Sequence, residues 1–287
     1  MNRLLAITTI YGEGVDLLEH WLWYYTSLGV DQCLIIAASF HEQNLLNGQS
    51  FTKNILPEVI NIAKRYPSQV FPVECDEYHT VYTEKLRNRV LQWCNLRPDD
   101  WIIYADLDEF YEYPVPVREL IRIMEEANDW AIHGHIIDRV AEDGSLKRIE
   151  PVPNNIGLQF PIGCKLTGKV FRANTRKIML ANGRVRVNAA HDNTYVGRWH
   201  RVPLGTLDQY IAHHFRWTNG LLKRLESRMN GKGVGDIYRS EIRRFFTYWN
   251  KHGKIDLFDP VIEARWLGAL SAGGKTNDRD SDSSCRY

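Results

Sequence analysis

A short apolar run that ends in three acids is the feature that most constrains this chain. Residues 101–105 (WIIYA) are followed at once by Asp106, Asp108 and Glu109. The apolar run predicts a buried strand, and open α/β sheets bind their ligands beyond the carboxyl ends of their strands. Carboxylates this close repel one another, and a divalent cation such as Mg²⁺ or Mn²⁺ relieves the repulsion. The sequence therefore favours a metal site over an acidic surface turn.

The spacing of the three acids predicts that they have different roles. Side chains two residues apart in extended chain point to the same side, so Asp106 and Asp108 can hold one cation. Such a cation can bridge a diphosphate and neutralise charge on a leaving phosphate. Glu109 points away from this pair, and we expect it to brace the loop.

Apolar periodicity predicts alternating strands and helices in the first half of the chain. Residues 4–10 form a strand, Asp16 is the expected N-cap of the next helix, and Gly29 ends that helix. A second strand over 32–38 completes a βαβ unit, which implies a parallel sheet. Further strands are expected at 70–74, 130–137, 177–180 and 210–215, and helices at 58–66, 83–95, 117–128, 221–229 and 237–249. In the helix over 83–95 we expect four inward side chains: Leu86, Val90, Leu91 and Trp93.

Composition limits the class of protein. The 287 residues have 44% hydrophobic and 25% charged residues, which is ordinary for a globular protein. A net charge of +1 gives no electrostatic reason to expect a nucleic-acid partner. Five scattered cysteines without a CxxC pair fit a reducing compartment, and no apolar stretch reaches the roughly 20 residues of a membrane span. We expect a cytoplasmic protein without a transmembrane segment.

Several separated motifs together carry a family resemblance. The chain resembles GT-A glycosyltransferases of the family 2 and family 92 type, the latter once called domain of unknown function 23. The resembling segments, in chain order, are 17–21 (LLEHW), 29–31 (GVD), 106–110 (DLDEF), 138–140 (DRV), 143–144 (DG), 159–161 (QFP), 176–178 (RKI) and 213–217 (HHFRW). The resemblance implies an α/β, GT-A-like nucleotide-diphospho-sugar transferase fold with a mostly parallel central sheet flanked by helices. It also implies one catalytic domain over 1–270, with a nucleotide-sugar-binding half (1–110) and an acceptor-binding half (111–270). The glycines, serines and other polar residues of 271–287 predict a disordered tail.

The resemblance further implies roles for individual residues near the donor. The first strand and its turn hold the nucleoside in such folds, which points to Thr9, Tyr11 and Glu13. The helix before the metal strand lies beside the donor, which points to Arg87 and Asn88.

Residues in the second half of the chain complete the expected site. Lys177, a cation among aliphatic residues, is suited to contact the diphosphate. A late histidine often completes the metal shell of GT-A enzymes, and we assign that role to His214 rather than His213. His191 matches a histidine that follows the lysine block and can bind metal or assist catalysis. For an inverting transfer the candidate bases are Asp138 and His191, with Asp192 as a rival.

The predicted function is a Mn²⁺- or Mg²⁺-dependent glycosyltransferase. It moves a sugar from a nucleotide-diphosphate donor, for which UDP-sugar is favoured, to a hydroxyl of a glycan or glycoconjugate, with inversion. Two alternatives stay open: a nucleotidyltransferase, and a catalytically inactive nucleotide- or sugar-binding module of the same fold. A nucleotidyltransferase should carry a glycine-rich, basic segment after the first strand, whereas residues 11–14 (YGEG) are acidic.

Overall fold

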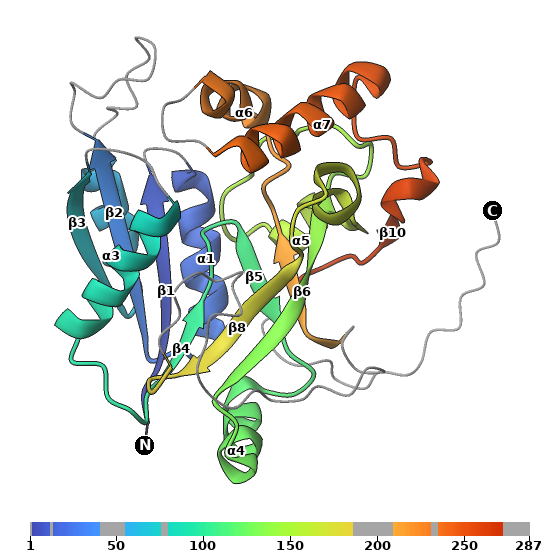
Figure 1. Ribbon diagram of the computed structural model, residues 1–287. Helices are drawn as coiled ribbons and strands as arrows, with labels where there is room; N and C mark the ends of the chain where they lie inside the picture. Colours follow the sequence, from blue (N-terminus) through green and yellow to red (C-terminus); the bar gives the residue numbers. More distant parts are fainter. Residues whose placement is uncertain are drawn as a thin grey trace.

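The computed structural model is built around one large mixed sheet (Figure 1). It describes residues 2–11, 14–40, 55–75, 80–185, 209–230 and 235–271. The strands are β1 (Leu4–Tyr11), β2 (Gln32–Phe40), β3 (Ser68–Cys75), β4 (Trp101–Tyr104), β5 (Glu109–Glu112), β6 (Ala131–Val140), β7 (Ile162–Cys164), β8 (Arg176–Asn182), β9 (Ile211–His214) and β10 (Arg265–Trp266). The helices are α1 (Val15–Ser27), α2 (Leu56–Ala63), α3 (Thr80–Trp93), α4 (Val117–Ala127), α5 (Ile156–Gln159), α6 (Leu221–Asn230) and α7 (Asp236–His252), with short helical turns η3 (Thr167–Phe171) and η5 (Pro260–Ile262).

The sheet is parallel in its first half and mixed in its second. The strand order is β10-β7-β6-β8-β4-β1-β2-β3, and β9 pairs with both β5 and β6. The longest ladders, β1 with β2 and β2 with β3, are parallel, as is β1 with β4. β8, β7 and β10 add antiparallel pairs. The predicted α/β class, with a mostly parallel central sheet flanked by helices, is confirmed.

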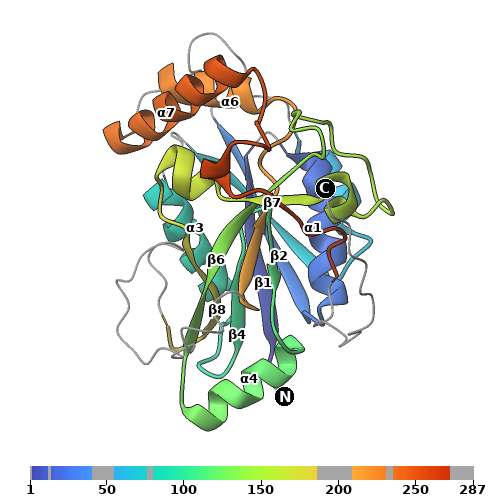
Figure 2. The same ribbon diagram turned by 90° about the vertical axis from the view of Figure 1, so that its right-hand side faces the viewer.

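Alternation along β1 places side chains on two buried faces. Leu4, Ala6 and Ile10 enter one core cluster, while Leu5 and Ile7 enter the other. Successive residues of a strand point to opposite faces, so a strand covered on both sides is apolar throughout. Helices α1 and α2 pack on the first face and α3 on the second, and Figure 2 shows α1 and α3 on opposite sides of β1 and β2.

A third core cluster lies in the C-terminal part of the chain. It joins η3 to α6, α7 and η5, with Phe171, Trp217 and Phe245 at its centre. Their rings contact one another in pairs with centroid separations of 5.1–5.6 Å. Figure 1 shows α6 and α7 together at the end of the sheet where β1 and β2 end. This cluster therefore carries two helices to the edge of the sheet at which the sequence predicts the site.

Two local predictions are wrong. Asp16 is not the N-cap of α1, because the helix begins at Val15 after Gly14, whose φ of 83° only glycine adopts readily. Asp16 lies instead in the first turn, where a carboxylate favours the helix dipole. Trp93 is not buried: its relative exposure is 58%, and at the last position of α3 its ring lies against Phe71 of β3, which is itself only partly buried. Leu86, Val90 and Leu91 are buried as predicted.

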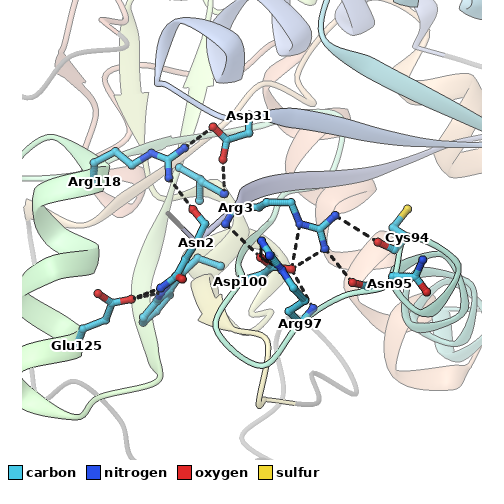
Figure 3. Close-up of polar contacts among 11 residues, drawn as sticks. Asn2, Arg3, Asp31, Cys94, Asn95, Arg97, Asp100, Arg118 and Glu125 are labelled. Carbon is cyan, nitrogen blue, oxygen red and sulfur yellow. Dashed lines mark hydrogen bonds and ion pairs between the residues drawn. The ribbon is translucent and has the colours of Figure 1, made fainter.

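Asp100 is a fully buried carboxylate just before β4, at the opposite end of this strand from the acids of the loop that follows it. Figure 3 shows Asp100 with Arg3 and Arg97 around it. Its oxygens accept hydrogen bonds from the backbone and guanidinium groups of Arg3 and Arg97. Burial raises the pKa of Asp100, but these hydrogen bonds outweigh burial and hold the pKa well below the ordinary value of 3.8. This carboxylate fastens the start of β1 to the start of β4.

We expect Asp100→Asn to lower the free energy of unfolding by about 2–3 kcal/mol at pH 7, because it removes a hydrogen-bonded buried charge. A depressed native pKa stabilises the fold above the unfolded-state pKa, and this stabilisation is lost as the pH falls through the native value. The difference between wild type and variant, from urea denaturation, should therefore be constant from pH 7 to 5 and shrink below about pH 4. A difference that stays constant down to pH 3 would show that the Asp100 charge is not its source.

Candidate active site

The carboxyl ends of β1 and β4 meet where the order of the strands reverses. β2 and β3 lie on one side of β1, and β4 lies on the other. Open α/β sheets bind ligands in the crevice that such a reversal creates. Asp106 and Asp108 follow β4 directly, in the turn that leads into β5. The topology therefore places both acids at the edge of the sheet where a ligand is expected.

Asp106 is held between two buried cations. Arg87 Nη2 of α3 lies 2.5 Å from Asp106 Oδ1, and Lys177 Nζ of β8 lies 2.7 Å from Oδ2. Burial raises the pKa of Asp106, but the charges of Lys177 and Arg87 outweigh burial and hold the pKa well below its ordinary value. The carboxylate is thus ionised and neutralised by side chains of the protein itself.

Glu109 braces the loop, as the sequence predicts. It is 2% exposed, its Oε1 lies 2.8 Å from Lys177 Nζ, and its Oε2 accepts hydrogen bonds from the Asp106 backbone N–H and from the Tyr111 hydroxyl. Burial raises the pKa of Glu109, with Lys177 opposing this and Asp106 adding to it. Lys177 is therefore shared by two carboxylates of one loop.

Asp108 faces His214 at the end of β9. His214 Nε2 lies 3.5 Å from Asp108 Oδ2, and His214 Nδ1 lies 3.0 Å from Asp138 Oδ1. Burial lowers the pKa of His214, but the two carboxylates outweigh burial and raise it to about 9. Burial raises the pKa of Asp108, but His214 outweighs this and lowers it to about 2. The pairing of β5 with β9, which sets Glu109 opposite His214, carries the histidine to this position.

Asp138 lies beneath His214 and is fully buried. Besides the contact with His214, its oxygens accept hydrogen bonds from the Thr167 backbone N–H, the Thr167 hydroxyl and Trp217 Nε1. Asp138 of β6 thus ties η3 and the end of β9 together. Its place in the structure is behind the imidazole, on the side away from Asp108.

The neighbouring His213 points to the other face of β9, as the sequence predicts for tandem histidines in a strand. Its Nε2 lies 2.8 Å from Glu112 Oε2, and its Nδ1 lies 3.2 Å from Arg139 Nη1. Arg139 is 1% exposed and donates to the carbonyls of Phe160 and Gly157. His213 therefore belongs to a separate buried cluster and does not contact Asp108.

The expected nucleoside-binding residues are partly described. Thr9 is 7% exposed, and its hydroxyl has no hydrogen-bond partner in the described part of the chain. The Tyr11 hydroxyl contacts the Thr83 hydroxyl at the start of α3, and Asn88 follows Arg87 on the same helix. Thr9 and Tyr11 lie at the end of β1, and Asn88 lies on α3. Four predictions lie outside the described residues: Glu13, His191, Asp192 and the tail after residue 271.

The sequence analysis missed Arg216, which follows the tandem histidines. Its guanidinium carbon lies 5.1 Å from the Phe171 ring centroid and 5.7 Å from that of Trp217. Its charge contributes to the low pKa of Asp108, after the larger effect of His214. The Arg-Trp pair in residues 213–217 was the available signal, although the sequence cannot show that Phe171 comes to lie beside it.

The three residues predicted to bind the metal, Asp106, Asp108 and His214, do not form one cluster in the structure. Within the described ranges no three His, Cys, Asp or Glu side chains converge closely enough to hold a metal ion. Asp108 and His214 lie together, with a carboxylate oxygen facing an imidazole nitrogen, and such groups suit Mn²⁺ or Mg²⁺. Asp106 instead faces Arg87 and Lys177.

Comparisons with known proteins give no family. No family model matches the sequence, and no curated protein matches it. Among solved structures, a 4-diphosphocytidyl-2C-methyl-D-erythritol synthase is 17% identical with a TM-score of 0.31, over 64% of this chain and 76% of that chain. Residues 1–349 of S. aureus TarS are 10% identical with a TM-score of 0.34, over 88% of this chain and 74% of that chain. Both TM-scores lie below 0.5, so the functional argument rests on the geometry of the chain itself.

Proposed function

We propose that this chain is a Mn²⁺- or Mg²⁺-dependent glycosyltransferase with a GT-A-like fold. It transfers a sugar from a nucleoside-diphosphate donor, most naturally a UDP-sugar, to a hydroxyl of a glycan or glycoconjugate, with inversion. The observation that carries the proposal is Asp108 paired with His214 at the carboxyl end of β4, where the strand order reverses.

Asp108 and His214 are the residues that would hold the cation. Asp138 accepts from His214 Nδ1, which leaves Nε2 directed at Asp108. A carboxylate behind a histidine is the usual arrangement that orients an imidazole toward a metal. Mg²⁺ and Mn²⁺ sites commonly combine one or two protein ligands with substrate phosphates and water. The bound cation supplies compensation for the charge of the departing diphosphate.

Arg87 and Lys177 act on the loop that presents Asp108. Both cations are buried and form ion pairs with Asp106, so they neutralise a carboxylate of the protein itself. With Glu109 and the hydrogen bond to its backbone, they hold the turn after β4 in one conformation. We infer that Asp106 positions the loop, while Asp108 is the acid that meets the ligand.

The general base is not Asp138 in this proposal. Its carboxylate is engaged by the Thr167 backbone N–H and hydroxyl, by Trp217 Nε1 and by His214 Nδ1, and it has no exposed surface. A base must reach the acceptor hydroxyl within hydrogen-bonding distance. Asp138 is therefore a positioning residue for His214, and His191 and its rival Asp192 are the candidate bases that remain.

The location and the partners of the protein stay predictions. In the part of the chain that the structure describes, no helix is both long and apolar enough to cross a bilayer. A cytoplasmic location and a glycan or glycoconjugate acceptor follow from composition and from the family resemblance.

Thermal melting with a panel of nucleotides and nucleotide sugars, with and without Mn²⁺, tests the proposed function. A ligand that binds the native state at 100 times its Kd adds about 2.7 kcal/mol of stability, which corresponds to about 5 °C or more for a chain of this size. We expect such a shift with UDP or a UDP-sugar only when Mn²⁺ is present. A shift with CTP or another nucleoside triphosphate, and none with nucleotide sugars, would favour a nucleotidyltransferase instead.

Asp108→Ala should abolish this shift, and Asp143→Ala is the matched control. Asp143 is an exposed carboxylate on a turn, and its contacts are with Ser145 and Lys147. The control should melt and respond like wild type. If no nucleotide shifts wild type, or if Asp108→Ala responds equally, the metal–diphosphate site is refuted.

A further inference from the structure

A small pocket lies between α1 and the segment that leads into α5. It is lined by one face of α1, which includes His20 and Trp23, by residues 152–156, and by Phe110 and Leu270. None of these described lining residues is an aspartate, glutamate, lysine or arginine. About 270 Å³ of space, including open solvent at the mouth, lies between the walls, and the enclosed part has room for about one water-sized group. The pocket therefore suits a neutral ligand that inserts one small polar group.

His20 offers this pocket a hydrogen-bond acceptor. It is 3% exposed, and its Nε2 lies 2.7 Å from the Glu150 carbonyl oxygen. Because a carbonyl oxygen only accepts, Nε2 carries the proton, and Nδ1 of the neutral ring is an acceptor. Burial lowers the pKa of His20, although the Glu150 carbonyl opposes this, so the ring is neutral at pH 7. No described residue donates to Nδ1, and Nδ1 is not sealed from solvent, so it is left to the pocket.

Trp23 and Asn154 add an aromatic face and an amide. Trp23 is 43% exposed and Asn154 is exposed, and neither side chain has a hydrogen bond or ring contact with another described residue. The face of a sugar ring is built of C–H groups that can lie on an indole, while its edge carries hydroxyls that both donate and accept. A neutral acceptor, an aromatic face and an amide around one pocket match the face and edge of such a ring.

The wall of the pocket is already fixed by hydrogen bonds within the chain. The Asn155 amide accepts from the Leu270 N–H and donates to the Leu270 carbonyl. Gln159 Nε2 donates to the carbonyls of Glu150 and Asn154. These contacts hold the segment before α5 in place before any ligand arrives. A preformed wall reduces the ordering cost of binding.

We propose that this pocket binds one neutral sugar unit, with a ring hydroxyl donating to His20 Nδ1, the ring face on Trp23 and a second hydroxyl on the Asn154 amide. The inference rests on the proposed function only for the role of that sugar, which is a unit of the acceptor glycan other than the reacting one. Both proposed metal ligands are described residues, and neither lines the pocket. Phe110 does line it and follows Asp108 by two residues, so the pocket wall lies within about 7 Å of the Asp108 backbone.

Saturation-transfer NMR with the methyl glycosides of glucose and galactose, in EDTA and without nucleotide, tests the pocket. Wild type should bind at least one of them, and Trp23→Ala, Asn154→Ala and His20→Phe should each weaken binding by about tenfold, the equivalent of one lost contact. Trp93→Ala is the matched control, because Trp93 is an exposed tryptophan at the end of α3. The anionic methyl glucuronide should bind no better than the neutral glycosides.

Two results of this first arm would overturn the proposal. One is the absence of glycoside binding by wild type, which would mean that the pocket holds an ordered water only. The other is equal binding by wild type and by Trp23→Ala and Asn154→Ala, whose changed side chains are exposed, with native melting curves as the check on folding.

A second arm separates this pocket from the donor crevice. The glycoside should still bind wild type saturated with UDP and Mn²⁺, and Asp108→Ala should bind it like wild type. If UDP displaces the glycoside, the sugar lies in the donor crevice and the assignment to this pocket is wrong. If the glycoside binds as expected but no nucleotide binds at all, the sugar pocket stands while the transferase and the acceptor role fail.

Discussion

Replacing Lys177 by methionine is expected to lower the free energy of unfolding by about 3–5 kcal/mol, because breaking a buried ion pair leaves its partners without compensation. Lys177 is fully buried between Asp106 and Glu109, with its Nζ 2.7 Å and 2.8 Å from their oxygens. Methionine matches the length of the side chain but removes the charge. Urea denaturation at pH 7 measures the loss, with Lys147→Met as control, since Lys147 is exposed and 3.8 Å from Asp143.

Neutralising Glu109 as well should recover part of the loss. Of Lys177, Glu109 and Asp106, only Asp106 keeps a charge in the double variant Lys177→Met/Glu109→Gln. Arg87 still forms an ion pair with Asp106. Contacting residues of one network are not additive, so the double variant should be more stable than the sum of the two single changes predicts. Additive losses, or a loss for Lys177→Met no larger than for Lys147→Met, would contradict the proposed sharing of one cation by two carboxylates.

The elements that the sequence predicts well are those with a strong local period. The apolar run after position 100 and the alternating faces of β1 follow from burial on both sides of a parallel sheet. The short strands β5, β7 and β10 were not predicted, because two to four residues carry no measurable period. Strand β5 matters most, since its pairing with β9 carries His214 to Asp108.

The partners of the charged residues could not be predicted from the sequence. The position of Lys177 among aliphatic residues indicated a special cation, but its contacts with Asp106 and Glu109 depend on how β8 lies against β4. Asp106 and Lys177 are 71 residues apart. Sequence shows which charges exist and on which face of an element they lie, whereas the fold decides which opposite charges meet. Lys177 and Arg87, which the sequence predicts to contact or lie beside the donor, contact carboxylates of this loop in the structure.

Removing the Asp108 carboxylate is expected to have the largest effect on ligand binding. Among the described residues, no lysine or arginine lies within ion-pair distance of Asp108. Its partner is His214, which Asp138 orients. Asp108→Asn keeps the size of the side chain and removes its charge, which a hard cation requires. We expect the affinity for Mn²⁺ in the presence of UDP to fall at least about tenfold, as for the loss of a metal-supporting group.

Electron paramagnetic resonance of Mn²⁺ titrated with the protein and UDP measures this directly, because bound and free Mn²⁺ give different signals. We predict one bound Mn²⁺ per wild-type chain, the same for the surface control Asp143→Asn, and a large loss of bound Mn²⁺ for Asp108→Asn. Equal binding by Asp108→Asn and wild type, or no binding by wild type, would contradict the assignment of the metal site to Asp108 and His214.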